Sequence, residues 1–535
     1  MRVRKQALAA SAGLVLLAVS PAYGSHVGTA GPTSLAWPRG EASVGYSSLP
    51  ALRSAFARFP ARIIRTVPAL HVVQVRPAGD AAAFAAEVSR LPGIRFVQAT
   101  AARHENAEPG LAISFGRPLP WEWQYTATRE DAVDPAILRA AGAITIAVID
   151  TGADLTAPDL AAKAPIAYNA RTGSNDVRDS AGHGTFVAAL AAGSVTNGDG
   201  IAGFGGDAQL LIIKAGAGDG SFTDLDEATA VVYAVDHGAR IINLSLGGAT
   251  TTSTEKKAME YAASHGVLVV AAAGNEFQEG NPVEYPAALL QPLGSKGVGG
   301  YGLAVGASTT SGTRAPFSNT GTYLSLLAPG DNVFSALAST SQPGRFPRVT
   351  LPDALSGLYG YGSGTSFATP EVSGAAALVW AANPLLDAAG VAQALKESAS
   401  SHGIWSAELG WGVLDVAEAV KRATGAKTQT ASSIITVSGQ VLKQLAAARP
   451  GARNATIVAT LRSVVPGVAP SSRLVSLESF EHSSWAPTGE TSTSSTGRAT
   501  WTLKLKKGTY RLRARWPGAG DLAGALSATL VLKVA

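Results

Sequence analysis

Four short segments of the chain are apolar along almost their whole length, and they constrain the fold more than any other feature. They lie at residues 144–149, 210–213, 240–244 and 267–272. Stretches with helical character separate them, at 185–192, 225–236 and 255–264. A strand that is apolar on both sides has to be covered on both faces, which is typical of a parallel sheet between two layers of helices. The pattern therefore predicts an α/β fold with a mainly parallel sheet and helices on both faces.

The first residues of the chain predict export. Arg2, Arg4 and Lys5 precede an apolar run at 7–19, and small residues follow it up to Gly24. A basic start, a short apolar run and a small-residue cleavage site are the parts of a secretory signal peptide. The run is shorter than the roughly 20 residues that cross a bilayer. We therefore expect residues 1–24 to be a signal peptide, the protein to be secreted and extracellular, and no segment to span a membrane.

The next part of the chain predicts a small separate unit. Residues 25–48 are rich in Gly, Ser, Pro and Ala and are expected to have little order. Strands are expected at 63–64, 70–75 and 94–98, and a helix at 81–91. The unit contains no cluster of candidate catalytic residues. We interpret residues 25–104 as a propeptide, within which about 49–104 form a removable α+β prodomain.

The last part of the chain predicts a third unit. Polar and small residues at 424–433 indicate a linker, which follows a predicted catalytic domain at 105–423. Short strands bounded by turn residues are expected at 434–437, 455–461, 499–505, 509–516 and 528–534. Short strands without helices predict an all-β sandwich over residues 434–535.

Charge is distributed unevenly along the chain. Residues 1–104 carry 12 basic and 3 acidic side chains, and residues 426–535 carry 14 and 4, whereas residues 105–425 carry 17 and 31. The net charge of +5 thus arises in the two flanks, and the acidic centre argues against nucleic acid as a partner. Opposite signs favour docking of the flanks on the centre.

The chain has no cysteine, which excludes disulfides, a thiolate nucleophile and cysteine-bound metals.

Two residues of the α/β region predict catalysis by a hydroxyl nucleophile. Asp150 ends the first apolar strand, and functional groups of open α/β sheets gather beyond the carboxyl ends of the strands. His183 alone among the eight histidines stands between two glycines at the start of an apolar helix. A hydroxyl nucleophile needs a histidine base and a carboxylate that fixes its tautomer. Asp-Thr-Gly at Asp150 also fits aspartic proteases, but the chain has no second copy, so only a homodimer would supply one.

Ser366 is the candidate nucleophile. It precedes a helix expected at 371–380, and a helix N-terminus favours the negative charge of a developing oxyanion. Asn275 follows an apolar strand, and its amide can donate to the same oxyanion. Helix capping by Ser366 and a turn role for Asn275 are the structural alternatives. Residues 243–248 lead from a strand into a Gly-rich segment suited to pairing with a bound peptide.

Together these segments resemble the subtilisin-like (subtilase) family of serine proteases. The resemblance covers about residues 120–421 and rests on the motifs at 147–152, 182–185, 245–248, 272–275 and 364–370. The chain order Asp150, His183, Ser366 distinguishes this family from unrelated folds that use the same triad.

The resemblance implies a serine endopeptidase that is made as a zymogen. Ser366 would attack the scissile carbonyl, His183 would transfer the proton, Asp150 would orient His183, and Asn275 would hold the oxyanion. The substrate would be bound by Ser245, Leu246, Gly247, Ala272, Ala273 and Gly274. The prodomain would be an intramolecular inhibitor, and residues 434–535 resemble bacterial immunoglobulin-like domains. We expect a monomer whose partners are protein or peptide substrates.

Three positions depart from the family pattern. Phe186 and Glu371 stand where histidine is frequent, and Phe367 follows the nucleophile, where methionine is common. Phe367 predicts tolerance of peroxide, because no thioether lies next to the nucleophile. We expect no cofactor to be required for the chemistry. A structural calcium ion has no clear loop to support it, since the candidate at 197–200 is too short.

Other functions remain open at this level. The main alternative is a catalytically inactive secreted adhesion or carrier protein on a protease fold, although such a protein is expected to lose a triad residue or Asn275. A different acyl hydrolase with the same triad is a further alternative. Glu276, next to Asn275, is a candidate for reaching the primary specificity pocket and favouring basic side chains there.

Overall fold

The structure is a computed structural model that describes most of the chain from residue 37 onward. The described residues are 37, 40–105, 122–197, 200–349, 357–425, 433–441, 453–463, 474–481, 484–494, 498–516, 525–527 and 530–534. The predicted signal peptide lies outside them, as do residues 198 and 199 of the segment considered for calcium. Within the described ranges, no helix has the length and apolar character needed to cross a bilayer.

A seven-stranded parallel sheet forms the centre of residues 122–425. Its strands lie in the order β13-β12-β11-β10-β6-β8-β7, and every neighbouring pair is parallel. Four strands match the predicted segments: β6 (Thr145–Asp150), β8 (Gln209–Lys214), β10 (Ile241–Leu244) and β11 (Leu268–Ala272). Three more extend the sheet: β7 (Ile166–Asn169), β12 (Gly302–Ser308) and β13 (Leu326–Pro329). The predicted α/β fold is confirmed.

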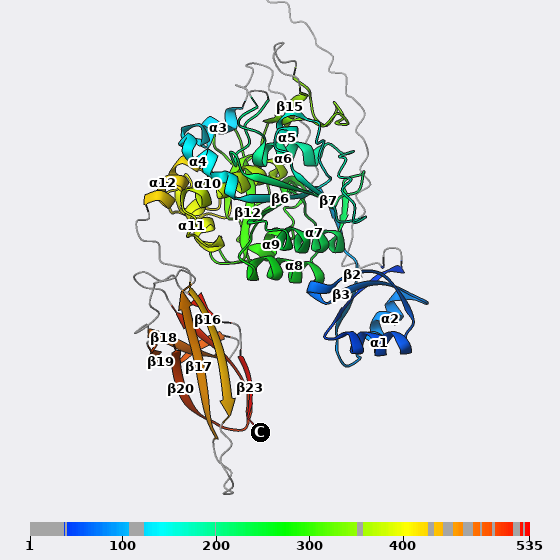
Figure 1. The fold of residues 1–535 in the computed structure, drawn as a ribbon, viewed down its shortest axis with the longest axis vertical. Helices are drawn as coiled ribbons and strands as arrows, with labels where there is room; N and C mark the ends of the chain where they lie inside the picture. Colours follow the sequence, from blue (N-terminus) through cyan, green and yellow to red (C-terminus); the bar gives the residue numbers. More distant parts are fainter. Residues whose placement is uncertain are drawn as a thin grey trace, which may run out of the picture. The chain divides into compact units, whose positions relative to one another are not determined.

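Helices cover both faces of this sheet (Figure 1). On one face, α6 (His183–Ala192) and α10 (Thr365–Ala382) share a core with Ile146 and Val148 of β6. On the other face, α7 (Asp224–Asp236) and α8 (Ser253–Ser264) share a core with Ala147 and Ile149. Successive residues of β6 thus enter different cores, which explains why residues 146–149 are all apolar.

Shorter elements complete the central unit. The remaining helices are α3 (Trp123–Ala127), α4 (Pro135–Ala140), α5 (Pro158–Ala161), α9 (Ala287–Leu290), α11 (Ala388–Ser398) and α12 (Val416–Gly425). Outside the large sheet, β14 (Val333–Ala336) pairs with β15 (Tyr359–Gly362). In addition, β9 (Ser221–Thr223) pairs with β5 (Ala102–His104), which comes from the N-terminal side.

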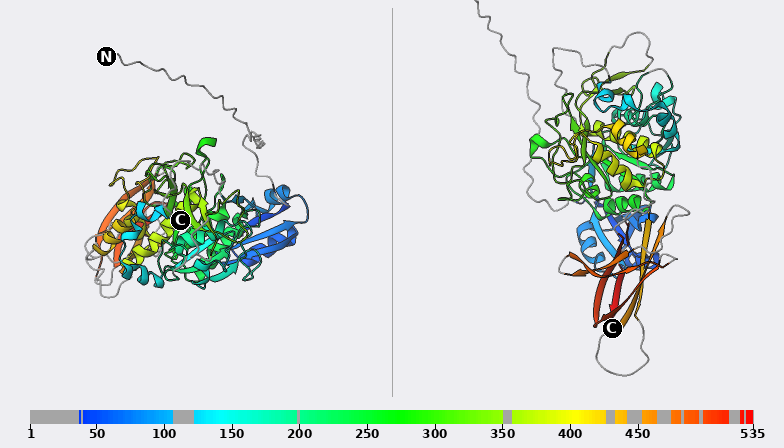
Figure 2. Two further views of the ribbon diagram at one scale, coloured as in Figure 1. Left: turned by 90° about the horizontal axis from the view of Figure 1, so that it is seen from above. Right: turned by 90° about the vertical axis from the view of Figure 1, so that its left-hand side faces the viewer.

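Residues 40–99 form an antiparallel sheet with two helices on one face (Figures 1 and 2). The strand order is β2 (Ala61–Val67), β3 (Val72–Pro77), β1 (Ala42–Tyr46) and β4 (Ile94–Ala99). The helices α1 (Leu49–Arg58) and α2 (Ala81–Val88) bury Leu52 and Phe84 with Val44 and Val75 of the sheet. The expectation of little order before residue 49 was wrong for β1, which occupies an inner position of the sheet and is buried along its whole length.

The C-terminal residues form two antiparallel sheets, coloured orange to red in Figure 2. One contains β16 (Ser433–Val441), β17 (Arg453–Ser463) and β20 (Arg498–Leu505). The other contains β18 (Leu474–Glu481), β19 (Ser484–Ser492), β21 (Gly508–Trp516), β22 (Ala525–Leu526) and β23 (Leu530–Val534). Ile457 and Trp501 of the first sheet share one core with Leu477 and Leu512 of the second. The two sheets therefore face each other, and the predicted all-β sandwich is confirmed.

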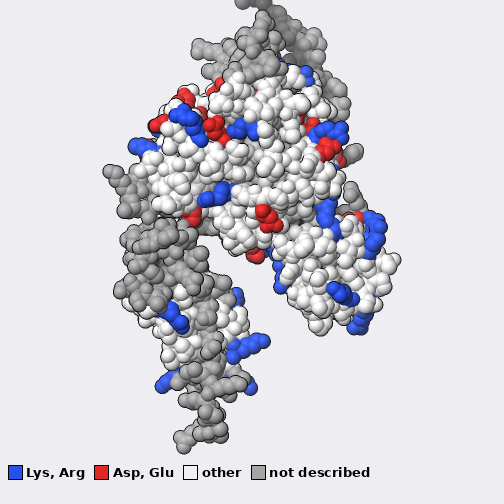
Figure 3. Space-filling model, viewed as in Figure 1, with Lys and Arg blue, Asp and Glu red and all other residues white. Residues whose placement is uncertain are grey.

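Surface charge follows the division seen in the sequence. In Figure 3, Lys and Arg prevail on the described residues of the N-terminal and C-terminal units, whereas both signs occur on the central unit. In the C-terminal unit, Arg513 and Arg515 lie 2.6 Å and 3.7 Å from the carboxylate of Glu478. Two arginines of β21 are thus partly neutralised within the same sheet.

Candidate active site

Asp150 is the last residue of β6 and lies at the carboxyl edge of the parallel sheet. Its side chain is buried, and Oδ1 accepts hydrogen bonds from His183 Nδ1 at 2.8 Å and from the N–H of Thr151 at 2.7 Å. Burial raises the pKa of Asp150 above its ordinary value of 3.8, while His183 and the Thr151 N–H act in the opposite direction. An ionised Asp150 accepts a hydrogen bond from the Nδ1–H of His183, so Nε2 is the basic nitrogen of the neutral imidazole.

A second carboxylate, Asp179, fixes the helix that carries His183. Its Oδ1 accepts from the N–H of Gly182 and from the hydroxyl of Thr151, both at 2.8 Å. Its Oδ2 accepts from the N–H and the hydroxyl of Thr185 at 2.8 Å and 2.7 Å. Asp179 thereby ties the first turn of α6 to the loop after β6. Sequence reasoning missed this role, although an acidic residue just before a helix start is a recognisable capping signal.

Gly184 allows α6 and β6 to approach each other closely. A Cβ at this position would lie 2.1 Å from the backbone oxygen of Gly152 and 3.0 Å from Oδ1 of Asp150. A side chain would therefore force the helix away from the strand. The second glycine of the Gly-His-Gly motif is required for the hydrogen bond between His183 and Asp150.

Ser366 lies in the first turn of α10, which begins at Thr365 rather than at residue 371 as expected. Pro370 lies inside this helix and has no N–H to donate to the backbone oxygen of Ser366. The hydroxyl of Ser245 donates to that oxygen instead, at 2.7 Å. In return, Ser366 Oγ donates to the backbone oxygen of Ser245 at 3.3 Å. The helix starts before the proline because Ser245 satisfies the group that the proline leaves.

Asn275 follows β11 and faces the first turn of α10. Its Oδ1 accepts a hydrogen bond from the N–H of Thr365 at 2.8 Å, which fixes the orientation of the amide. A Cβ on Gly364 would lie 3.3 Å from Nδ2 of Asn275. The donating end of the amide therefore lies beside the residues that precede Ser366, close to the N-terminus of α10. Such a position suits a donor to an oxyanion.

The expected substrate-binding residues follow two neighbouring strands of the sheet. Residues 245–247 follow β10, and residues 272–274 lie at the end of β11. Gly247 and His104 exchange two backbone hydrogen bonds, at 3.0 Å and 3.2 Å. On its other side, β5 pairs antiparallel with β9. Residues 102–104 thus run as an extra strand between β9 and Gly247, which is how an extended peptide adds to exposed strands.

Two carboxyl groups lie near Gly274. Glu276 Oε2 accepts from the N–H of Asn275 at 2.7 Å and from Asn319 at 3.3 Å. Glu284 is buried, and this burial, together with Glu276, raises its pKa to about 8. A Cβ on Gly274 would contact both side chains. No sequence motif pointed to Glu284.

Within the described ranges, no group of three or more His, Asp or Glu residues is arranged to hold a metal ion.

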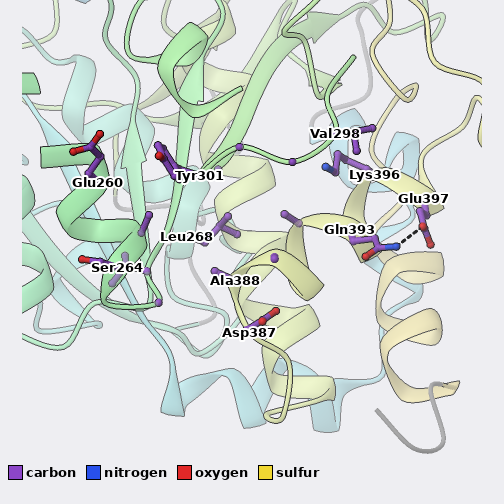
Figure 4. Close-up of a pocket in the computed structure, with 18 of the residues that line it drawn as sticks. Glu260, Ser264, Leu268, Val298, Tyr301, Asp387, Ala388, Gln393, Lys396 and Glu397 are labelled. Atoms are coloured by element: carbon purple, nitrogen blue, oxygen red, sulfur yellow. Dashed lines mark hydrogen bonds between the residues drawn. The ribbon is translucent and has the colours of Figure 1, made fainter. Parts of the chain in front are cut away.

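A pocket elsewhere on the central unit is distinct from this site. Its lining includes Leu268, Tyr301 and Lys396 (Figure 4). Leu268 begins β11, so the pocket lies at the amino end of a strand whose carboxyl end leads to Asn275. Lys396 donates to the backbone oxygen of Gly297 at 2.6 Å, and burial lowers its pKa to about 8. The catalytic candidates do not line this pocket.

Sequence comparison relates the central unit to known proteases. Residues 141–412 match the subtilase family (peptidase S8). Thermophilic serine proteinase of Bacillus sp. (strain AK1) is 38% identical over 234 residues, which cover 44% of this chain and 51% of that protein. Subtilisin E of Bacillus subtilis (strain 168) is 33% identical over 264 residues, which cover 49% of this chain and 61% of that protein. The chain thus spans between half and two thirds of the length of these relatives. Subtilisin of Bacillus pumilus, also 33% identical, is covered to 85%.

Solved structures show the same fold. One is fervidolysin from Fervidobacterium pennivorans, described as a keratinolytic enzyme related to subtilisin. It superposes with a TM-score of 0.60 over 89% of this chain and 86% of that chain, at 20% sequence identity. A mutant of the epidermin leader peptide processing serine protease of Staphylococcus aureus superposes with a TM-score of 0.54. The superposition covers 71% of this chain and 98% of that chain, at 21% sequence identity. The family match extends over more than half of the chain and contains Asp150, His183, Asn275 and Ser366. This chain is a member of the subtilase family.

Proposed function

We propose that the protein is a serine endopeptidase that hydrolyses peptide bonds with Ser366 as nucleophile. The observation that supports this most is the 2.8 Å hydrogen bond between Asp150 and His183 at the edge of the sheet where α10 begins. The ring of His183 lies 5.5 Å from the ring of Phe367, the residue after Ser366. A carboxylate, an imidazole and a hydroxyl in this order make up the machinery of acyl transfer.

The proposed mechanism uses only groups of the chain itself. His183 Nε2 takes the proton of Ser366 as Oγ attacks the scissile carbonyl, and Asp150 stabilises the imidazolium that forms. The Nδ2 of Asn275 and the backbone N–H of Ser366 donate to the oxyanion of the tetrahedral intermediate. His183 then gives its proton to the leaving amine, which breaks the peptide bond and leaves an acyl-enzyme. Water, activated by His183, hydrolyses the ester and restores Ser366.

We further propose that the chain is secreted as a zymogen. Residues 102–104 lie as a strand against Gly247, and the carboxylate of Glu105 is 3.7 Å from Nδ1 of His183. A peptide in that position competes with a substrate for the same backbone groups. The prodomain is therefore proposed as an intramolecular inhibitor, removed by a cut that places the mature N-terminus between residues 104 and 120. The enzyme is proposed to act as a monomer on protein or peptide substrates.

Hydrolysis of casein by the secreted protein and by its Ser366→Ala variant tests the proposal. We expect clearing by the wild type and loss of at least about 10³-fold in rate for the variant. Absence of hydrolysis by a folded, processed wild type would favour the inactive adhesion or carrier protein. Matched peptide and ester substrates test whether the protein is a different acyl hydrolase with the same triad. An esterase without peptidase activity would cleave only the esters.

A further inference from the structure

Residues 102–105 show how an extended peptide lies next to the candidate active site. His104 pairs with Gly247 on one side and with Ser221 of β9 on the other. The N–H of Glu105 donates to the backbone oxygen of Gly220 at 3.2 Å. Backbone hydrogen bonds of this kind accept almost any sequence, whereas selectivity comes from the pockets that receive the side chains. The side chains of this segment therefore indicate which pockets exist.

The side chain of Arg103 ends in an acidic pocket formed by Glu227 and Glu255. Its Nε donates to Glu255 Oε1 at 2.9 Å, and its Nη2 lies 2.8 Å from the same oxygen. Oε2 of Glu227 lies 3.6 Å from Nε. All three side chains are completely buried, with 0% of each exposed to solvent. This is an ion pair without the screening that weakens surface pairs.

The acidic pocket belongs to the central unit, not to the segment that fills it. Glu227 comes from α7 and Glu255 from α8, whereas Arg103 precedes the whole subtilase match. Asp224, one turn before Glu227, is a third buried acidic group on α7 and accepts from the N–H of Ala101 at 3.2 Å. The pocket therefore stays with the enzyme when residues before the proposed cut are lost.

An empty acidic pocket would be unfavourable, which argues for a cationic ligand. Neither oxygen of Glu227 accepts a hydrogen bond from any residue that the structure describes, so its partner is the guanidinium of Arg103. Burial, and next Glu255, raise the pKa of Glu227 well above its ordinary value of 4.5, and Arg103 opposes both. Removing one partner of a buried ion pair leaves an uncompensated charge or forces protonation. The planar guanidinium fits two carboxylates better than an ammonium group does.

We infer that Glu227 and Glu255 form a subsite that selects protein substrates with arginine at the residue before the one that pairs with Gly247. This inference rests on the proposed peptidase function and names a class of substrate for it. A processed enzyme would bind incoming peptides along the path of residues 102–105, and an arginine at this position would replace Arg103 between the two carboxylates.

The same segment offers a weaker pair for comparison. The carboxylate of Glu105 lies 2.7 Å from Arg345, whose side chain is 30% exposed. A partly exposed pair is screened by water and salt and contributes little. A change at position 105 of a substrate peptide is therefore expected to weaken binding much less than a change at position 103.

The test uses the processed wild-type enzyme and internally quenched peptides with the sequence of residues 100–112. Position 103 carries arginine, its uncharged analogue citrulline, or leucine. We expect citrulline to lower kcat/KM by roughly 30-fold or more, in line with the loss of a buried charged partner. Glutamine at position 105 should raise the inhibition constant less than fivefold, and binding is compared there because Glu105 also lies 3.7 Å from Nδ1 of His183. Each peptide is also measured as a competitive inhibitor of casein hydrolysis, so that the arginine preference is obtained even from peptides that are cut slowly.

Enzyme variants assign the preference to the acidic pocket. In Glu255→Gln and in Glu227→Gln, the ratio of arginine to citrulline peptides should fall to within about threefold. The matched control is Glu260→Gln, an exposed residue of the same helix α8, which should keep the wild-type ratio. Having both pocket variants protects the test against one that does not fold.

The outcomes separate this inference from the proposed function. If the wild type hydrolyses casein but treats arginine and citrulline peptides alike, both as substrates and as inhibitors, the subsite assignment is wrong. Retention of the arginine preference in both pocket variants would also overturn it. If a folded, processed wild type cleaves neither casein nor any peptide, the peptidase proposal itself fails.

Discussion

At the scale of single residues, two carboxylates divide the task of placing His183. Asp150 binds the imidazole directly, and Asp179 holds the start of the helix that carries it. Asp150 is therefore the group whose charge affects proton transfer, because it sets which ring nitrogen bears the proton. Asp179 affects only the position of His183, because it holds the start of α6.

Replacing Asp150 by asparagine should lower kcat about 10⁴-fold with little change in fold, because the amide favours the wrong tautomer of His183. The measurement is kcat for a quenched peptide, with circular dichroism as a check on folding. Asp176→Asn is a matched control from the nearby surface and should leave kcat unchanged. A fall of less than tenfold for Asp150→Asn would contradict the role assigned to this residue.

Phe367 leads to a prediction about oxidation. It is buried and packs against Phe186 at 4.3 Å between ring centroids, and the chain contains only two methionines, Met1 and the buried Met259. The processed enzyme should keep most of its activity in dilute peroxide, because no thioether adjoins Ser366. Phe367→Met should remove that tolerance. Equal, rapid loss of activity in both proteins would show that oxidation acts elsewhere.

Several residues of the site were predictable and others were not, for a physical reason. His183 is distinguished by the glycines on both sides of it, and Gly184 indeed has to be glycine. Glu227 and Glu255 carry no such mark, because acidic residues are frequent in the first turn of helices, where the dipole favours them. Their meeting depends on the packing of α7 against α8 and on a third segment from the N-terminal side.

At the scale of elements, α10 contains an unusual buried carboxyl group. Glu371 lies within the first two turns of the helix and is 0% exposed, and neither of its oxygens has a hydrogen-bond partner among the described residues. Burial raises its pKa well above the ordinary value of 4.5. The folded protein thus holds this proton more tightly than the unfolded chain does.

The position of Glu371 predicts how stability depends on pH. The stability that the folded protein gains from the protonated Glu371 is fully present below about pH 4.5. It is lost as the pH rises toward the raised pKa of the folded state. Glu371→Gln should therefore raise the melting temperature at pH 9, with a smaller gain at pH 5. Calorimetry in a Ser366→Ala background avoids self-digestion. A variant that is less stable at pH 9 would mean that the carboxylate has a stabilising role.

Continuous apolar strands were predicted well, whereas strands at edges or with small residues were not. β6, β8, β10 and β11 have cores on both faces, so most of their residues are apolar. β7 lies at the edge of the sheet and leaves Ile166 more than half exposed, and β12 contains Gly302 and Gly306, which weaken a strand pattern. The early start of α10 was missed because proline normally ends a helix, and the compensating hydroxyl of Ser245 is distant in sequence.

At the scale of the whole molecule, the acidic centre and the basic N-terminal unit are joined by ion pairs. Arg65 pairs with Asp226 of α7, and Arg103 pairs with Glu255 of α8. The expectation that the basic N-terminal flank docks on the acidic centre agrees with these contacts. The domain boundaries themselves remain predictions.

Intact-mass measurement of the secreted protein tests the proposed maturation. The wild type should begin between residues 104 and 120, because its own active site removes the residues before that point. Ser366→Ala, purified in the same way and incubated alone, should keep a chain that begins near residue 25. An identical cut in the variant, in the absence of any other protease, would show that processing does not depend on Ser366.

The most direct test of the central claim is covalent labelling of the nucleophile by a fluorophosphonate, read by peptide mass mapping. The processed wild type should take up one label per chain on Ser366 and lose its casein hydrolysis in step with labelling. Ser366→Ala should take up none, and His183→Ala should react far more slowly, because the hydroxyl lacks its base. An enzyme that hydrolyses casein while Ser366 stays unlabelled, or that is labelled at a different residue, would contradict the account.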